Sequence, residues 1–374
     1  MGDAWRGKAV VITTVMVFGL TYGLTAPLVS LRLSAAGYGE ALIGLNAAMH
    51  AAGVFAIAPM LPGLCRRFSP WALMLFSLAA IFLTLCLFAF LPLASWFALR
   101  LLLGVFSEII LVVTETWLNH ASVESARAKT MAWYVASLSL GFALGPFFLL
   151  AGHGEAPFFY GALLALAAGA ILLAHRKKQA PLAQEKTAPF WRYLALAPVA
   201  MAATMLNAAL EAAGMNLLVI YAVNLGWSEN LAALLLSVLM TGAIVLQLPV
   251  GWLADRVDRR RLVVIFAAAS TFGALIWPWA LAFAPLAWGV MFFWGGLFVG
   301  IYTLVIIQVG ERFSGAQLAG VYAAMSIMWA AGALLGPSLG GLAMSVGRDG
   351  LPWLAATLCG MFTLYAWRGN RGDA

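Results

Sequence analysis

Long apolar segments alternate with short polar breaks along almost the whole chain. Each apolar segment has about 20 residues or more, the length that an α-helix needs to cross a hydrocarbon core of about 30 Å. The alternating polarity of barrel strands is absent, and an open strand cannot satisfy its backbone in lipid. The pattern predicts an all-α integral membrane protein with twelve spans. These lie at 8–33, 41–64, 71–91, 94–119, 129–152, 156–175, 191–222, 229–252, 262–284, 286–310, 315–346 and 350–368.

The composition excludes a water-soluble globule. Hydrophobic residues make up 64% of the chain and charged residues only 9%, whereas about a quarter of the residues in soluble domains are charged. Residues 1–8 are too short for a cleavable signal peptide, and the first apolar run is too long for one. We therefore expect a multi-pass membrane protein.

The basic residues predict its orientation. If the amino terminus is cytoplasmic, all but three of the 21 basic residues lie on cytoplasmic segments or at their edges, the exceptions being Arg32, Arg100 and Arg348. Such asymmetry is what the positive-inside rule predicts. Both termini are then cytoplasmic, and the net charge of +7 reflects topology, so no nucleic-acid partner is expected.

An internal repeat predicts two halves. Residues 37–42 resemble residues 226–231, and the same shift of 189 residues relates Gly53 to Gly242. Six spans in the same order on each side form parallel repeats. The predicted organisation is an amino-terminal half at 1–175, a cytoplasmic linker at 176–190 and a carboxy-terminal half at 191–374. The predicted fold is two pseudo-symmetric six-helix bundles.

The polar segment after the eighth span carries the most specific motif. It reads Gly251-Trp252-Leu253-Ala254-Asp255-Arg256-Val257-Asp258-Arg259-Arg260-Arg261 and resembles the Gly-x-x-x-Asp-Arg-x-Gly-Arg-Arg signature of the major facilitator superfamily. Arg100-x-x-x-Gly104 and two Gly-x-x-x-Gly-Pro patterns extend the resemblance over the entire chain. The end of the fourth span, Glu115 to Asn119, further resembles the YcaD-like bacterial members. Asp258 departs from the signature, and the first-half hairpin has Arg66 where the family has an acid.

The resemblance implies a membrane transporter of the bacterial inner membrane and a gate. The expected gating residues are Gly251, Asp255, Arg256 and Arg127. We expect Gly251 to let backbones approach closely and the arginines to hold the loop at the anionic leaflet. In the family, the acid equivalent to Asp255 makes a contact across the two halves when the cytoplasmic side is shut. By pseudo-symmetry, its partner here is expected to be the start of helix five, near Arg127, where the helix dipole favours a carboxylate. The alternative is a solvated loop that only sets topology.

The Gly-x-x-x-Gly-Pro patterns predict close helix packing, because glycines one turn apart leave one face without side chains. We expect Gly141, Gly145 and Pro146 to face the eighth span. Gly332, Gly336 and Pro337, followed by Gly340 and Gly341, are expected to face the second. Family members with this pattern are often proton antiporters, and ordinary packing without a bearing on transport direction is the alternative.

Charges inside spans are the strongest functional signal, because each costs about 2.5–3.5 kcal/mol near the bilayer centre. The fourth span carries Arg100, Glu108 and Glu115, which fall within a sector of about 80°, and the seventh carries Glu211. In the family, spans one, four, seven and ten line the central cavity. The candidate proton- or substrate-binding residues are Arg100, Glu108, Glu115 and Glu211, and Glu108 and Glu211 in particular are expected to handle protons or substrate. Alternatively, Glu108 is a structural partner of Arg100, and Glu115 forms an ion pair of the gate.

Four of the other polar residues on these spans are candidate substrate contacts: Tyr22, Asn207, Tyr302 and Gln308. His50 is interpreted as a packing residue. The favoured function is a monomeric, proton-coupled transporter that exports a small amphiphilic or hydrophobic compound, with protons and membrane lipid as its other partners. An importer or uniporter of a metabolite is the alternative, and a lipid-modifying membrane enzyme is less favoured.

Catalytic and metal-binding motifs are absent from the sequence. Cys65, Cys86 and Cys359 are isolated, without the spacing of a metal site. The chain also lacks a paired His-Glu metal motif, a phosphate-binding glycine loop followed by lysine, and a nucleophile elbow. We therefore expect no enzyme activity, no cofactor and no metal.

Overall fold

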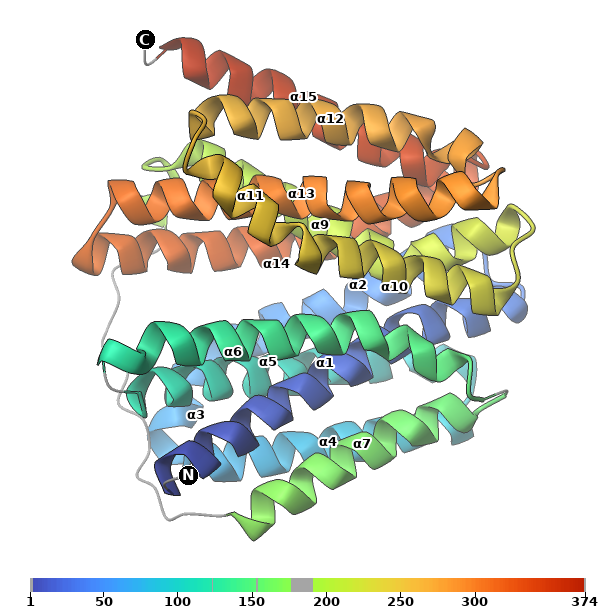
Figure 1. Ribbon diagram of the computed structural model, residues 1–374. Helices are drawn as coiled ribbons and strands as arrows, with labels where there is room; N and C mark the ends of the chain where they lie inside the picture. Colours follow the sequence, from blue (N-terminus) through green and yellow to red (C-terminus); the bar gives the residue numbers. More distant parts are fainter. Residues whose placement is uncertain (1–2, 123, 153, 176–190, 373–374) are drawn as a thin grey trace. The chain divides into compact units, whose positions relative to one another are not determined.

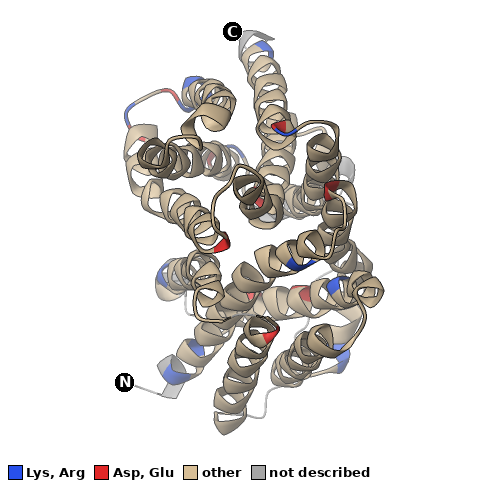
Figure 2. Cartoon of the chain, turned by 90° about the vertical axis from the view of Figure 1, so that its right-hand side faces the viewer, with Lys and Arg blue, Asp and Glu red and all other residues tan. Residues whose placement is uncertain are grey.

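The computed structural model describes residues 3–122, 124–152, 154–175 and 191–372 (Figure 1). These residues form helices and short connections, without a strand. The predicted linker at 176–190 lies outside the described residues. Figure 2 shows how few charged residues the helices carry, as expected of segments that cross a bilayer.

The first half of the sequence forms six long helical segments, some of them built from two or three shorter helices. They are α1 (Asp3–Ala35), α2 (Glu40–Ile57) with η1 (Ala58–Met60) and α3 (Leu61–Arg67), α4 (Pro70–Phe90), η2 (Leu93–Ser95) with α5 (Trp96–His120), α6 (Glu124–Leu144) with η3 (Gly145–Leu149), and α7 (Ala156–Ala174). The change from α6 to η3 coincides with Pro146, which lacks the amide proton that an α-helix would use.

The second half begins with the short α8 (Trp191–Leu194) and then forms six more long segments. They are α9 (Pro198–Asn224), α10 (Glu229–Val245) with α11 (Gln247–Ala254), α12 (Arg259–Ala280), α13 (Ala284–Arg312), α14 (Gly315–Val346) and α15 (Gly350–Gly372). Eleven segments of the described chain are long and apolar enough to cross a membrane. The twelfth, α15, is less apolar because it contains Trp353, Trp367 and Arg368. The predicted all-helical fold with twelve membrane helices is confirmed.

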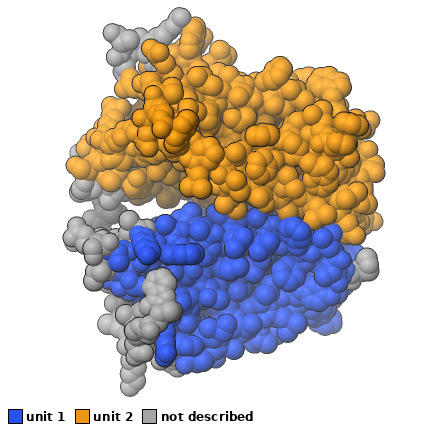
Figure 3. Space-filling model, in the orientation of Figure 1, with its two compact units in different colours: residues 1–33, 49–185 blue, residues 34–48, 186–374 orange. Residues whose placement is uncertain are grey.

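Two compact units make up the chain (Figure 3). Unit 1 contains residues 1–33 and 49–185, and unit 2 contains residues 34–48 and 186–374. The first turns of α2 therefore pack with the second half of the sequence. In unit 2, Asn224 Nδ2 at the end of α9 donates to Glu40 Oε1 at 3.3 Å.

Glycines bring the helices of unit 1 into backbone contact. A Cβ added at Gly141 would lie 2.5 Å from the carbonyl oxygen of Met16, and one at Gly145 would lie 2.6 Å from the Cα of Gly23. Both partners belong to α1. The prediction that Gly141, Gly145 and Pro146 face the eighth span is therefore wrong for the two glycines, which face the first span of their own unit. Pro146, in the same turn, is buried.

The corresponding glycines of α14 pack mainly on α9. A Cβ at Gly332 would lie 3.0 Å from the Cβ of Ala208, and one at Gly336 would lie 2.6 Å from the Cα of Ala209. Gly340 also faces α9. The prediction that these three glycines face the second span is wrong, because the first and fifth helices of each half form the close pair.

Two residues of the α14 pattern, Pro337 and Gly341, contact the second span as predicted. A Cβ at Gly341 would lie 2.9 Å from the Cα of Gly44 in α2. The carbonyl oxygen of Pro337 likewise faces Gly44, so closely that a side chain there would collide with it. The predicted partner is confirmed for Gly341 and Pro337.

The internal repeat is visible in these crossings. In unit 1, a Cβ at Gly53 of α2 would lie 2.9 Å from the amide nitrogen of Val105 in α5. In unit 2, a Cβ at Gly242 of α10 would lie 2.9 Å from the Cα of Phe292 in α13. Gly53 and Gly242 are the glycines that the shift of 189 residues relates, so the repeat in sequence is also a repeat in packing.

Two alanine substitutions on one membrane segment test this packing. We expect Gly242→Ala to destabilise the protein by about 1–3 kcal/mol, because the new methyl group would force α10 away from α13. Gly251→Ala, where an added Cβ has no neighbour within 4 Å, should be neutral or stabilising by up to about 1 kcal/mol. Thermal unfolding of the detergent-purified variants measures both effects. Equal melting temperatures would contradict the close crossing at Gly242.

Candidate functional site

Three polar side chains from different helices meet inside unit 1. Arg100 of α5 is fully buried, with 0% of its surface exposed. The ring of Tyr22 in α1 lies with its centroid 4.8 Å from that of His50 in α2, and the guanidinium of Arg100 is close enough to interact electrostatically with both. Gly104, one turn after Arg100, allows α5 to touch the backbone of His50. The Arg100-x-x-x-Gly104 motif therefore places a buried cation beside two aromatic hydrogen-bonding groups.

A small cavity of about 10 Å³ lies next to this cluster, which is room for one water molecule. Tyr22, His50 and Ser107 contribute polar groups to its wall. Thr21 and Thr25 also line it, but their hydroxyls donate to carbonyls of their own helix, at 2.8 and 2.7 Å. The predicted candidate Tyr22 thus has access to a polar cavity, together with His50, which the sequence had indicated only as a packing residue.

The two acids of α5 share a different neighbour. Glu108 is half-buried and Glu115 is exposed. Tyr134 of α6 is 4% exposed; its hydroxyl donates to the carbonyl oxygen of Leu111 at 3.3 Å and lies within electrostatic range of both carboxylates. The site in α5 is therefore divided: Arg100 lies with Tyr22 and His50, and the two acids lie with Tyr134.

Sequence reasoning missed Tyr134. Its signal was weak, because one tyrosine on a span that the family does not place at the central cavity looks like ordinary packing. Tyr134 lies near both acids because α6 crosses α5 between them, and the two acids are seven residues apart. The sequence does not show where two helices cross.

In unit 2, Glu211 and Asn207 of α9 are hydrogen-bonded to each other. Asn207 Nδ2 donates to Glu211 Oε2 at 3.3 Å. Asn207 is 4% exposed, and its Oδ1 is buried without a hydrogen-bond partner within the described chain. The pair thus presents a carboxylate and an amide oxygen one turn apart, both able to accept from a ligand or a proton donor.

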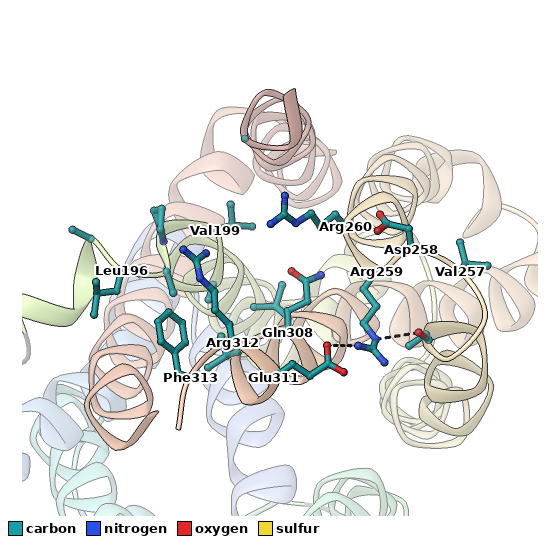
Figure 4. Close-up of a pocket in the computed structure, with 18 residues that line it drawn as sticks. Leu196, Val199, Val257, Asp258, Arg259, Arg260, Gln308, Glu311, Arg312 and Phe313 are labelled. Carbon is teal, nitrogen blue, oxygen red and sulfur yellow. Dashed lines mark hydrogen bonds and ion pairs between the residues drawn. The ribbon is translucent and has the colours of Figure 1, made fainter. Parts of the chain in front are cut away.

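The two candidates on α13 have different settings. Tyr302 is half-buried near the middle of the second half of the helix. Gln308 lies close to the end of α13, where it lines a pocket formed within unit 2 (Figure 4). Gln308 shares this pocket with basic residues at the start of α12 and the end of α13. The role of both residues as substrate contacts stays a prediction.

Arg259, the first residue of α12, holds the turn between α11 and α12 in place. Its guanidinium forms an ion pair with Glu311 of α13 and lies 3.8 Å from Asp255 Oδ1, while its Nε donates to the carbonyl oxygen of Ala254 at 3.0 Å. Figure 4 shows the ion pair of Arg259 with Glu311 and its hydrogen bond to Ala254 as dashed lines. The signature arginine thereby ties the α11–α12 turn to the end of α13.

Asp258, which replaces a glycine of the family signature, has a structural role in the turn. Asp258 Oδ1 accepts a hydrogen bond from the backbone amide of Arg261 at 2.9 Å, and this makes it the N-cap of α12. Aspartate is among the preferred N-cap residues. The position that carries glycine in the family signature therefore serves here as a helix cap.

The other expected gating residues behave differently. Arg256 stacks its guanidinium over the ring of Trp252, 3.8 Å from the centroid. An added Cβ at Gly251 has no neighbour within 4 Å among the described residues, so the prediction that Gly251 permits close backbone approach is wrong. The side chain of Arg127 lies outside the described residues. The contact between Asp255 and the start of helix five stays a prediction.

Comparison with known proteins identifies the family. The profile of the Major Facilitator Superfamily matches residues 11–337. The chain belongs to this superfamily. It is therefore a multi-pass secondary transporter, and the family consists of transporters rather than enzymes.

Bacterial relatives agree with this assignment. The MFS-type transporter YfkF of Bacillus subtilis (strain 168) is 28% identical over 349 residues, covering 89% of this chain and 87% of YfkF. The MFS-type transporter YcaD of Salmonella arizonae is 22% identical over 283 residues, covering 75% of this chain and 73% of YcaD. The predicted resemblance to YcaD-like members is confirmed as a distant relationship.

Solved structures show the same fold. A mutant of the nucleoside transporter NupG matches with a TM-score of 0.81 at 14% identity, covering 98% of this chain and 99% of NupG. A D-xylose-proton symporter matches with a TM-score of 0.78 at 13% identity, covering 98% of both chains. At such identities the likeness extends to the fold alone.

The helix cap at Asp258 is directly testable. We expect Asp258→Ala to lower the free energy of unfolding by about 0.5–2 kcal/mol, because the amide of Arg261 loses its acceptor. Asp258→Asn keeps an acceptor and should retain most of the stability. Asp255→Ala removes an acid three residues earlier whose carboxylate does not cap the start of α12, so it controls for the loss of charge. A loss from Asp255→Ala as large as that from Asp258→Ala would contradict the cap, and thermal unfolding distinguishes the cases.

Proposed function

We propose that the protein is a proton-coupled transporter that exports a small amphiphilic or hydrophobic compound by alternating access of two halves. The boundaries proposed for the halves are 1–175 and 191–374. The observation that carries the proposal is one partly buried carboxylate in each unit, Glu108 on the fourth span and Glu211 on the seventh. Each lies on a membrane segment that otherwise avoids acids near its middle.

The surroundings of the two acids support proton handling. A charge near the bilayer centre costs about 2.5–3.5 kcal/mol, so an acid there is expected to have a function. Glu211 is hydrogen-bonded to the neutral amide of Asn207, and Glu108 lies near the neutral hydroxyl of Tyr134. Neutral partners of this kind accommodate the carboxyl group both with and without its proton.

An aromatic wall in unit 1 supports a partly hydrophobic substrate. The ring centroid of Tyr22 lies 5.6 Å from that of Phe142 in α6 and 6.2 Å from that of Phe18. Such rings bind flat apolar groups, while Tyr22 also lines the small cavity beside His50. This combination fits an amphiphilic compound.

A metabolite importer or uniporter is the second candidate. Arg100 is buried beside Tyr22 and His50, and such a cluster could bind a polar or anionic metabolite in place of an amphiphile. Proteins of the same fold include a D-xylose-proton symporter and a nucleoside transporter. The direction of proton-driven transport in proteoliposomes separates the exporter from the importer.

For the gate, we propose that Asp255 contacts the start of helix five in the cytoplasm-closed state. Its side chain is 80% exposed within the described chain and 3.8 Å from Arg259, so it forms only a loose ion pair and remains available for a second partner. The dipole of a helix start favours a carboxylate by about 0.3–1 kcal/mol.

The test of Glu108 and Glu211 as proton carriers first requires a transported ligand. A thermal-shift screen on purified protein supplies one, because a compound that binds the folded state raises the melting temperature. In proteoliposomes with a proton gradient, we expect the double variant Glu108→Gln, Glu211→Gln to lose concentrative transport of this ligand. Equilibrium exchange should survive, because glutamine preserves the size and most hydrogen bonds of each side chain.

Glu115→Gln is the matched control, since Glu115 is an exposed acid on the same helix as Glu108. It should retain gradient-driven transport. Full concentrative transport in the double variant would rule out Glu108 and Glu211 as the proton site.

The proposed topology has its own test. In a variant without the three native cysteines, single cysteines at positions 39, 154 and 348 should react with an impermeant thiol reagent added outside intact cells. A cysteine at position 182, in the segment between the halves, should react only after the cells are opened. The reverse labelling pattern would overturn the assignment of both termini to the cytoplasm.

A further inference from the structure

The second helix of each half is interrupted at corresponding positions. In unit 1, α2 ends at Ile57 and η1 follows, and in unit 2, α10 ends at Val245 and α11 begins at Gln247. The shift of 189 residues that relates the halves places Ile57 on Leu246. Membrane segments that are interrupted at corresponding positions of two halves are a mark of binding sites in transporters.

A proline accounts for the interruption in unit 2. Pro249 lacks an amide proton, so the carbonyl of Val245 cannot accept the hydrogen bond that an unbroken α-helix would supply. In a membrane, backbone groups that a proline frees are satisfied by polar side chains or by water. Val245 is 49% exposed and Leu248 is 82% exposed. The break therefore lies at the surface of unit 2, where water or a ligand can reach it.

Gln247 makes the break in unit 2 polar, whereas Ala58 holds the equivalent position in unit 1. Gln247 Nε2 donates to the carbonyl oxygen of Ala243 at 2.6 Å, and Gln247 Oε1 accepts from Thr303 Oγ1 of α13 at 2.5 Å. Both side chains of this pair are partly exposed. A side-chain amide thus lies at an accessible break in a membrane helix.

The hydroxyl of Thr303 has a second acceptor. Its Oγ1 also lies 3.3 Å from the carbonyl oxygen of Val299, one turn earlier in α13. When another donor approaches Gln247 Oε1, the single hydroxyl proton can turn to Val299 and stays hydrogen-bonded. Gln247 Nε2 has a second hydrogen besides the one donated to Ala243. The amide can therefore accept one hydrogen bond from a ligand and donate another, and no protein group is left unsatisfied.

We propose that Gln247 binds an uncharged hydroxyl group of the transported compound, and that this hydroxyl replaces Thr303 as the donor to Oε1. A hydroxyl both donates and accepts, as the amide does. The ion pairs of Arg259 belong to the opposite end of α11, about 12 Å away at 1.5 Å per residue, so a neutral group suits the site. The exposed Val245 and Leu248 suit the apolar part of the same compound.

This inference rests on the proposed function and adds to it the polar group of the substrate. It also adds a contact on the eighth span, which is not among the four spans expected to line the central cavity.

Thiol labelling tests whether Gln247 lies in a water-filled space. In membranes that contain a cysteine-free variant with Gln247→Cys, we expect 2-aminoethyl methanethiosulfonate to modify position 247, because this reagent reacts with thiolates in contact with water. Leu239→Cys, on the same span and 1% exposed, should stay unmodified. An unreactive thiol at position 247 would place the side chain against lipid or protein and would overturn the proposal.

Two probes test recognition of a hydroxyl: 2-naphthalenemethanol and its methyl ether. They share a flat apolar ring and an oxygen acceptor, and only the alcohol has a donor. Each is titrated into the detergent-purified full chain while the melting temperature is followed. We expect the alcohol to bind about threefold or more tightly than the ether, which corresponds to one neutral hydrogen bond. Gln247→Leu should abolish this preference.

Thr303→Val has an expected effect in the opposite direction. It removes the hydroxyl that occupies Gln247 Oε1 in the empty site, so the alcohol should bind more tightly. A pair that only joins two helices would leave the preference between the probes unchanged. Thr241→Val is the matched control, because the hydroxyl of Thr241 on the same span donates to the carbonyl oxygen of Ser237 at 2.8 Å. It should alter neither affinity.

Three binding results would overturn the proposal: no saturable stabilisation by the alcohol, equal affinities for the alcohol and the ether, or a preference that survives Gln247→Leu. If Gln247→Leu does not fold, an alcohol affinity that Thr303→Val leaves unchanged or weakens overturns it instead. None of these measurements uses a proton gradient. A failure of Glu108 and Glu211 as proton carriers would therefore leave this inference standing.

Discussion

Close backbone contact at glycines is the constraint on which the rest of the structure depends. Lipid tails are as apolar as leucine, so helices in a membrane gain little by burying apolar side chains against each other and associate instead through close packing and polar contacts. Here the crossings of α2 with α5, of α10 with α13, and of α14 with α9 all occur where a Cβ atom would collide with a neighbouring backbone. The functional side chains take their positions from these crossings. Arg100 lies one turn from Gly104, whose contact with His50 fixes α2 against α5, and Glu211 lies two residues after Ala209, which receives Gly336 of α14.

The spans, the repeat and the buried charges could be predicted from the sequence, because each depends on local composition or on a fixed shift along the chain. Apolar length alone defines a span, and Gly53 and Gly242 match both in sequence and in packing. The partners of the glycines could not be predicted in the same way. A Gly-x-x-x-Gly pattern shows that one face of a helix is smooth, but it contains no information about which helix meets that face, so the pattern alone could not show that Gly332 and Gly336 meet α9 instead of the second span.

The candidate site was predicted in part for the same reason. Arg100, Glu108 and Glu211 are conspicuous because a charge within an apolar span is rare and costly. Tyr134 is inconspicuous, since its role depends on where α6 crosses α5. Asp258 appeared only as a deviation from a signature, although aspartate before a helix is itself an N-cap signal. The sequence therefore shows residues that are unusual in a membrane, and it does not show residues whose function comes from their neighbours.

The basic run after α11 illustrates how one short segment meets several physical demands. All of its arginines favour the cytoplasmic side under the positive-inside rule, yet the structure gives them separate neighbours. Arg256 covers Trp252, Arg259 pairs with Glu311, Arg260 lines the pocket, and the amide of Arg261 is capped by Asp258. Asp258 and Glu311 are the two acids that line the pocket, and each of them holds part of the basic run in place. A glycine at position 258 would leave the start of α12 without this side-chain acceptor, so the departure from the family signature stabilises the helix start that carries Arg259, Arg260 and Arg261.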